Sequence, residues 1–237
     1  MHKFFLVFSL ILSSCASSPV QEKGNIDKVN KIINTSPIKK PIRRTTKQSE
    51  ELITKIESRI NPAVETFCEE RNLTCDWEIS QEVNMTFNAY ATIEDGQKKI
   101  VLFTGLVSGV HYEEELAFVV AHEIAHHLAN HINESRITTG VGAALGGVLG
   151  AAVGLPTVGA TYGAALGRLS FSVDQENEAD EIVTKLLKDS GYDLEKARMG
   201  VIRLTRTGPS RMYSVFSDTH PSGPERIMWF DEISKNE

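Results

Sequence analysis

The chain has 237 residues, of which 41% are hydrophobic, so it suits one globular domain with extensions and is apolar enough to bury a core. The formal net charge of −6 is unevenly distributed. Residues 16–48 carry eight Lys/Arg against two acidic residues, whereas residues 49–237 carry sixteen against twenty-nine. An acidic body of this kind argues against nucleic acid as a partner.

Residues 1–14 are predicted to be a targeting signal rather than part of the fold. Lys3 precedes an apolar run over residues 4–12 that is too short to span a bilayer as a mature helix. Two serines and Cys15 follow, a pattern that resembles a bacterial lipoprotein signal, cut before Cys15 and lipidated on it. The residue after Cys15 is Ala16 rather than Asp, as in Gram-negative lipoproteins that are sent to the outer membrane. An ordinary secretory signal with an incidental cysteine is the alternative.

Residues 15–48 are predicted to be the lipidated cysteine followed by a flexible basic tether. The segment is rich in Ser, Pro, Asn, Lys and Thr, and we discern no apolar periodicity in it. Its basic pairs at 39–40 and 43–44 either contact anionic lipid headgroups or are simply solvated. The folded domain is expected over residues 49–237.

A helix is expected from Ser49, because apolar residues recur at helical spacing as far as Phe67. Asn61 and Pro62 would kink or restart it. Cys68 and Cys75 follow. In an oxidising compartment these two cysteines would form a disulfide that closes a short loop, and two buried thiols are the alternative.

Three strands and a helix come next in the chain. Residues 77–83 alternate like a strand, residues 85–92 form a second and residues 99–103 a third, with a turn at 94–97. We expect a small antiparallel sheet from them. Residues 112–131 contain no helix breaker and are predicted to be a helix.

The segment 137–167 carries no charge, and its glycines recur every four residues in two sets separated by a Leu-Pro-Thr sequence. It is predicted to form a hairpin of two Gly/Ala-faced helices that pack closely. Further helices are expected over residues 172–189, 193–205 and 223–234. The fold class is therefore α+β, mostly helical, with a small sheet and a Gly/Ala-rich helical hairpin.

The sequence His122-Glu123-Ile124-Ala125-His126 lies inside the predicted 112–131 helix. Residues four apart share one face of a helix, so both imidazoles can reach one metal ion. Glu123 lies beside them, where it can take a proton from the attacking water. This arrangement is typical of a zinc peptidase that binds one Zn²⁺ per chain.

A zinc site of this kind needs a third protein ligand. Glu176 and Asp180 lie four apart at the start of the 172–189 helix. Glu176 is the predicted third ligand, and Asp180 is expected to accept a hydrogen bond from the free ring nitrogen of a ligand histidine. The alternative is a solvated acidic helix start.

His127 and His131 also lie four apart, but their pair faces a different direction on the helix. Leu128 occupies the position where a catalytic base would have to lie. We interpret these two histidines as surface residues or as supports for the ligands.

The His-Glu-x-x-His motif, followed by a Glu-x-x-Ala-Asp element at 176–180, resembles the zinc metallopeptidases of the HtpX, BepA and LoiP type. These are related to the prenyl-protein endopeptidases and the mitochondrial Oma protease. Further matches lie at residues 88–91, 105–106 with 115–117, and 219–221 with Arg226, so the likeness covers about residues 50–235. The resemblance implies a gluzincin-type fold and an exported, lipid-anchored member.

The resemblance also implies roles for individual residues. Glu123 would be the general base and later the proton donor to the leaving amine. His220 would stabilise the oxyanion or occupy the open metal position in a resting state, and Arg226 would organise that loop. The extended segment 88–92, if it is an edge strand, would hold the backbone of an extended substrate by strand addition. Asn88, Ala89 and Tyr90 are its expected substrate-binding residues.

The expected function is zinc-dependent endoproteolysis of unfolded or misassembled envelope proteins, on the periplasmic face of the outer membrane. One alternative is a chaperone-like binding module with a latent zinc site. The other is a membrane-interacting protein that uses the glycine-rich segment to insert into the membrane or to assemble. The sequence does not identify a substrate or an oligomeric state.

Overall fold

The computed structural model describes residues 19–36, 40–137, 148, 151–152, 171–205, 220 and 223–236. The predicted signal with Cys15 and nearly all of the predicted glycine-rich hairpin therefore lie outside the described residues. The elements, in chain order, are α1 (Pro19–Thr35), α2 (Thr46–Arg71), β1 (Trp77–Glu82), β2 (Ala89–Glu94), β3 (Gln97–Phe103), α3 (Thr104–Gly109), α4 (Glu113–Leu128), α7 (Val173–Asp189), α8 (Leu194–Thr205) and α10 (Pro224–Asn236).

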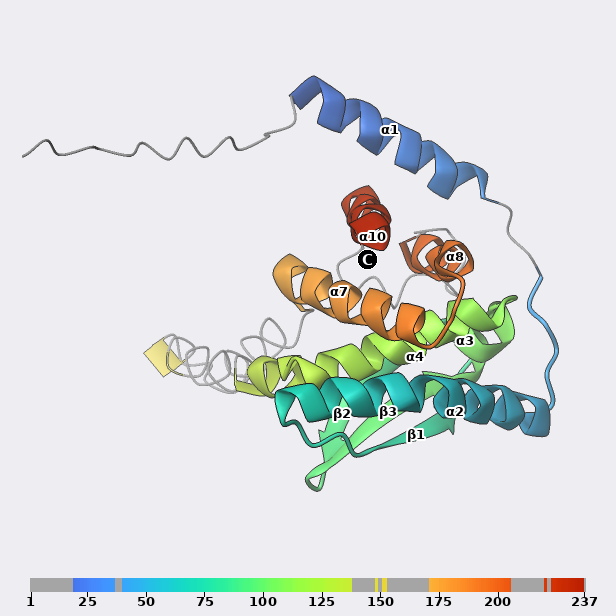
Figure 1. Ribbon diagram of the computed structural model, residues 1–237, viewed down its shortest axis with the longest axis vertical. Helices are drawn as coiled ribbons and strands as arrows, with labels where there is room; N and C mark the ends of the chain where they lie inside the picture. Colours follow the sequence, from blue (N-terminus) through green and yellow to red (C-terminus); the bar gives the residue numbers. More distant parts are fainter. Residues whose placement is uncertain are drawn as a thin grey trace, which may run out of the picture.

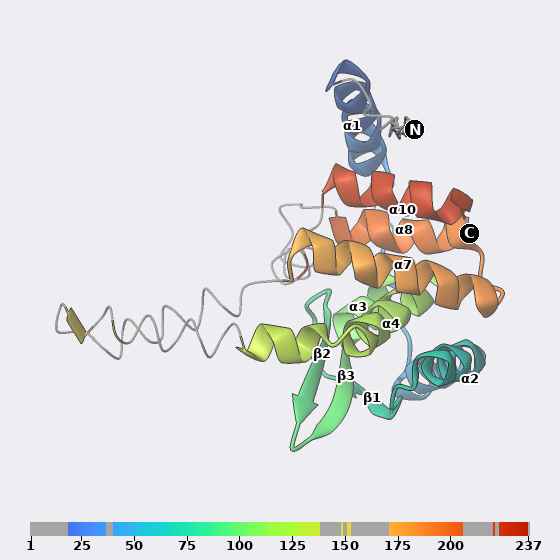
Figure 2. The ribbon, with the colours of Figure 1, turned by 60° about the vertical axis from the view of Figure 1, so that its left-hand side comes forward.

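Helix α4 is the centre of the fold. It packs against α7, α8 and α2 and against strands β2 and β3, and the views in Figures 1 and 2 show it between the sheet and the stacked helices α7, α8 and α10. From Glu115 to Leu128 every residue of α4 is buried. A helix that is surrounded on all sides carries whatever polar residues it has into the core.

The sheet has the order β1-β3-β2 and is mixed, which corrects the antiparallel sheet expected from the sequence. Strand β2 pairs antiparallel with β3 through the turn at Asp95 and Gly96, both at positive φ, whereas β1 runs parallel to β3. The alternation of side chains identifies a strand but not its partner, so the parallel pairing was not visible in the sequence. The mostly helical class with a three-stranded sheet is confirmed.

The second strand begins at Ala89 rather than Met85. Residues before it form a loop that is held to α3: Gly105 N donates to Asn84 O at 2.8 Å, and Thr104 Oγ1 donates to the same carbonyl at 2.8 Å. A β-carbon at Gly105 would clash with the carbonyl of Met85. The glycine therefore allows α3 to approach the loop that leads into β2.

Helix α2 begins one turn earlier than expected, because Thr45 caps it. The Thr45 side chain accepts from Gln48 N, and the Gln48 side chain accepts from Thr45 N, which is a capping box. The helix continues through Pro62 to Arg71. A disulfide joins Cys68 to Cys75, with Cα atoms 6.2 Å apart, and ties the end of α2 to the segment before β1.

Helix α1 lies in the segment that was expected to be a flexible tether. Its residues Val29 and Ile33 are buried, and it packs on α10 and α8. Ile26, Val29 and Ile33 recur at helical spacing, so a sparse apolar face is present after all. The expectation of a flexible tether is thus corrected for residues 19–35.

Helix α4 ends at Leu128, three residues before the expected end. Ala129 caps it, Asn130 adopts the left-handed conformation with φ of 63°, and residues 131–137 are helical again. The three later helices α7, α8 and α10 lie where the sequence placed them. Among the described residues, no helix combines the length and the apolar character needed to cross a membrane.

Candidate metal centre

Helix α4 brings His122 and His126 together in the core. Their Nε2 atoms are 3.0 Å apart, and both side chains are fully buried. Glu176 comes from the first turn of α7, where Ser172 caps the helix and Gln175 completes a capping box. Glu176 Oε2 lies 3.3 Å from His122 Nε2, and Oε1 lies 3.5 Å from His126 Nε2.

These separations fit a zinc ion. Donor atoms that surround Zn²⁺ as a tetrahedron, about 2.0–2.1 Å from the metal, lie roughly 3.3 Å from one another. The three separations between His122, His126 and Glu176 range from 3.0 to 3.5 Å. The set of two imidazoles and one carboxylate is also the donor chemistry that zinc prefers in catalytic sites. The predicted zinc ligands are therefore confirmed.

His220 adds a fourth donor to the cluster. Its Nδ1 lies 3.3 Å from His122 Nε2 and 2.9 Å from Glu176 Oε1. The four residues each offer one ligand atom, and these atoms lie within 4.8 Å of one another. The structure thus places His220 at the metal site, a position that sequence spacing alone did not define.

Asp180 and Arg226 lie behind His122. Asp180 Oδ1 is 3.2 Å from His122 Nδ1, the nitrogen that faces away from Glu176. Arg226 donates to both Asp180 oxygens at 2.8 Å, and its Nη1 lies 2.9 Å from Glu176 Oε2. The Arg226 guanidinium therefore connects Asp180, which supports the ligand His122, with Glu176, which is itself a ligand.

The charges of the site also suit a dication. Three carboxylates, Glu123, Glu176 and Asp180, are buried there with Arg226, which leaves two negative charges for a metal to balance. In the metal-free chain, burial and Arg226 oppose protonation of His122, but Glu176 and Asp180 outweigh them and raise its pKa to about 9. The pKa of Glu176 is held well below its usual range, because Arg226 and the neighbouring histidines overcome the effect of burial.

Glu123 lies between the metal ligands and strand β2. Its carboxyl is fully buried, with His220 Nε2 3.6 Å from Oε1. Burial raises the pKa of Glu123, although His220, His122 and the backbone N–H of Ala91 partly oppose the rise. A carboxylate with a raised pKa is a stronger base, which suits the role of Glu123 in taking a proton from water.

The second histidine pair does not form a metal site. His127 Nε2 lies 3.0 Å from the carbonyl of Lys99, and its ring stacks on Trp77. The break after Leu128 separates His131 from this face and turns it towards His126, with their Nδ1 atoms 3.0 Å apart. His131 is thus a neighbour of a ligand, and His127 holds α4 to the sheet.

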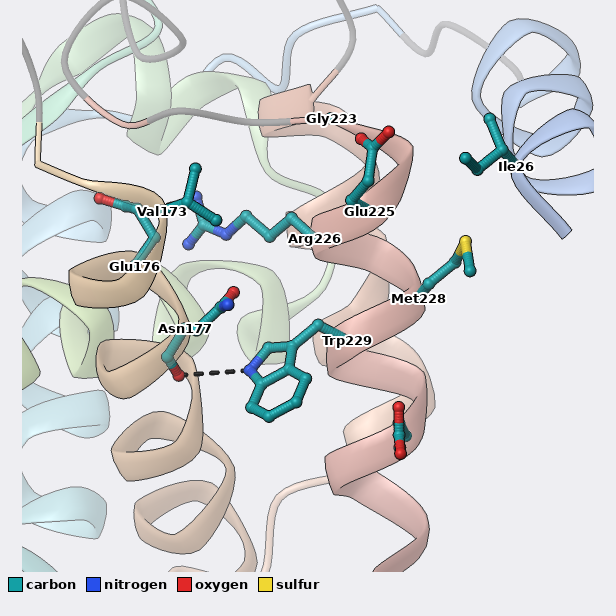
Figure 3. Close-up of a pocket in the computed structure, with 10 residues that line it drawn as sticks. Ile26, Val173, Glu176, Asn177, Gly223, Glu225, Arg226, Met228 and Trp229 are labelled. Atoms are coloured by element: carbon teal, nitrogen blue, oxygen red, sulfur yellow. Dashed lines mark hydrogen bonds and ion pairs between the residues drawn. The ribbon is translucent and has the colours of Figure 1, made fainter. Parts of the chain in front are cut away.

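Helix α10 is fixed to α7 by Trp229, whose Nε1 donates to Asn177 O at 3.3 Å (Figure 3). Figure 3 shows Arg226 reaching from α10 towards Glu176 on α7, with Val173 beside them. A cavity of about 460 Å³ lies between these helices and is bounded on its far side by Ile26 of α1. The Trp229 bond thus joins α10, the helix that carries Arg226, to α7, the helix that carries Glu176.

The expected substrate-binding residues lie at the start of β2. The side chains of Asn88 and Ala89 are buried, and the Tyr90 ring packs edge-on against Phe103, with centroids 5.8 Å apart. Contact of Asn88 or Ala89 with a substrate would therefore come from the main chain, whereas the Tyr90 side chain is partly exposed. Phe171, which stacks on His126 at 3.8 Å between centroids, was missed, because nothing in its sequence context distinguishes it from other apolar residues before a helix.

The fold and the site together define a zinc metallopeptidase of the His-Glu-x-x-His type with a glutamate as third ligand. The sequence pattern of peptidase family M48 matches residues 50–234, and the chain belongs to this family. A comparison with curated proteins found no match.

Proposed function

We propose that this metallopeptidase is an endopeptidase that cleaves extended or unfolded protein segments in the cell envelope, to which it is anchored by lipid on Cys15. The observation that carries the substrate class is the position of β2. It is the edge strand of the sheet on the side away from β1, and it packs against α4, the helix that bears Glu123.

The residues divide the reaction between them. A zinc ion held by His122, His126 and Glu176 would acidify a water molecule and polarise the scissile carbonyl. Glu123 takes a proton from the attacking water and returns it to the leaving amine. Its burial excludes bulk water from the carboxylate, which strengthens it as a base.

The register of β2 defines which of its main-chain groups are free for a substrate. Along an antiparallel ladder, hydrogen-bonded pairs alternate with pairs that are not hydrogen-bonded. The two-residue turn makes Glu94 and Gln97 a hydrogen-bonded pair. Phe103 N donates to Asn88 O at 3.1 Å, which fits the same alternation. The even-numbered residues therefore bond to β3, and Ala89, Ala91 and Ile93 direct their N–H and C=O groups to the outer edge. An extended chain can pair with this edge by strand addition.

Arg136 limits the length of this edge. Its Nη2 donates to the carbonyl of Ile93, one of the three outward-facing positions. Ala89 remains for a substrate with both its N–H and its C=O, whereas Ala91 offers only its C=O, because its N–H faces Glu123. The substrate is thereby expected to pair over a short stretch next to the base.

Peptides with a single N-methylated amide test this mode of binding. An N-methyl group removes one donor and blocks strand pairing where that amide faces β2, and it is harmless where the amide faces away. Moving the methyl group along one peptide should therefore abolish cleavage at alternate positions. Equal cleavage of all the methylated peptides would contradict strand addition.

His220 is proposed to act in the resting state. It is one of the four donors of the cluster, and a catalytic zinc ion with three protein ligands would need its fourth position for water, so a bound His220 would compete with that water. It would therefore have to leave before cleavage. On this account His220→Ala raises the basal rate of cleavage of a short peptide; a fall in rate would instead support a role in stabilising the oxyanion.

The membrane anchor is tested separately. Cys15→Ser should abolish labelling by radioactive palmitate and release the protein from the membrane fraction, whereas Cys68→Ser should leave labelling unchanged. Retained labelling of Cys15→Ser would contradict the lipoprotein assignment.

Quality control of envelope proteins predicts faster cleavage of reduced, unfolded substrate than of the same protein folded.

A further inference from the structure

We propose that His131 and Glu178 form a hydrogen-bonded relay behind the zinc ligand His126, so that each histidine ligand is backed by a carboxylate. His131 is then a positioning residue, since it acts through His126 and does not itself face the metal site. The inference rests on the zinc site described above and is independent of the proposed substrate and location.

The relay consists of two contacts in series. His126 Nδ1 lies 3.0 Å from His131 Nδ1, and His131 Nε2 lies 3.3 Å from Glu178 Oε2. His126 is fully buried and His131 is 1% exposed, whereas the Glu178 side chain is 60% exposed. The chain of contacts therefore leads from the core of the site to the surface.

One assignment of protons satisfies every member. His126 Nε2 faces the other ligand atoms, so its lone pair serves the metal and its proton lies on Nδ1. That proton needs an acceptor, and the facing atom is His131 Nδ1. The His131 proton then lies on Nε2 and is donated to the Glu178 carboxylate.

The break after α4 is what makes the relay possible. On an uninterrupted helix, residues five apart point about 140° away from each other around the axis. The left-handed residue Asn130 interrupts the helix, and the ring of His131 returns to that of His126, with centroids 5.1 Å apart. The contact between His131 and His126 thus depends on the left-handed conformation of Asn130.

The other ligand shows the same principle in a shorter form. His122 Nδ1 meets Asp180 Oδ1 directly at 3.2 Å. A negative charge behind a ligand histidine fixes its tautomer and increases its electron density at the metal, and loss of such a partner weakens metal binding about 10–100-fold. For His126 the charge is that of Glu178, transmitted through His131.

The test is the zinc dissociation constant of the full chain, measured by competition with a chromophoric chelator. His131→Ala should weaken zinc binding about 10–100-fold. His131→Asn should restore most of the affinity, because the amide oxygen can accept from His126 at the position of the lost Nδ1. Glu178→Gln, on the exposed end, should fold normally and weaken binding by a smaller factor, since the charge is lost but an acceptor remains.

His127→Ala is the matched control, because His127 is a buried histidine next to His126 in α4 and its ring bonds to Lys99 O instead. It should bind zinc as the unaltered chain does. The melting temperature of each zinc-free variant separates loss of fold from loss of affinity. Unchanged zinc affinity in His131→Ala, or an equal loss in His127→Ala, would overturn the relay. Neither result depends on whether any substrate is cleaved.

Discussion

Arg226 on α10 donates to both carboxylate oxygens of Asp180 on α7, at 2.8 Å each, inside a site where both side chains are buried. The pair lies directly behind His122 and extends to the ligand Glu176. A contact between two distant segments, rather than the local motif, therefore fixes the carboxylates around the metal.

Replacing Arg226 by Met should lower the free energy of unfolding by about 3–5 kcal/mol, because buried carboxylates lose their cation. Arg198→Met is the control: it also breaks an arginine–aspartate pair that involves α10, but the Asp231 partner is 30% exposed. That change should cost about 1 kcal/mol or less. Equal losses in chemical denaturation would show that burial of the Arg226 pair has no special effect.

The local parts of the site were predictable from the sequence. The spacing of His122, Glu123 and His126 places them close together on one helix. Ser172 followed by Gln175 is a capping-box pattern that indicates the start of the helix that carries Glu176. Each of these inferences needs only a few consecutive residues.

The non-local parts were not predictable in this way. The parallel pairing of β1 with β3 depends on partners some twenty residues apart. The sequence signal of helix α1 is a narrow apolar face of Ile26, Val29 and Ile33. Val29 and Ile33 are buried where α1 packs on α10 and α8. The break at Asn130 has no glycine or proline to mark it, so the contact between His131 and His126 stayed hidden.

Loss of the disulfide should destabilise the fold moderately. The bond between Cys68 and Cys75 closes a short loop, for which chain entropy predicts about 2–3 kcal/mol. The double variant Cys68→Ser/Cys75→Ser should unfold at correspondingly lower denaturant concentration. Adding reductant should destabilise the unaltered chain by the same amount and leave the variant unaffected; a variant that responds to reductant would contradict this assignment.

Removal of zinc should lower stability as well as abolish activity. Without the metal, the buried carboxylates Glu123, Glu176 and Asp180 are balanced only by Arg226 and by a protonated His122. Free zinc at a thousand times its dissociation constant should stabilise the fold by about 4 kcal/mol relative to the metal-free chain. Melting curves across a zinc titration measure this directly, and a melting temperature that is independent of zinc would contradict the site.

The most direct test of the central assignment is Glu123→Gln, with zinc content and cleavage of unfolded casein measured on the same preparation. Glutamine fills the same space but cannot take a proton, and Glu123 is not one of the three zinc ligands. The account predicts one zinc per chain, as in the unaltered protein, and loss of cleavage by about 100-fold or more. Cleavage at an undiminished rate by the zinc-loaded variant would contradict Glu123 as the catalytic base.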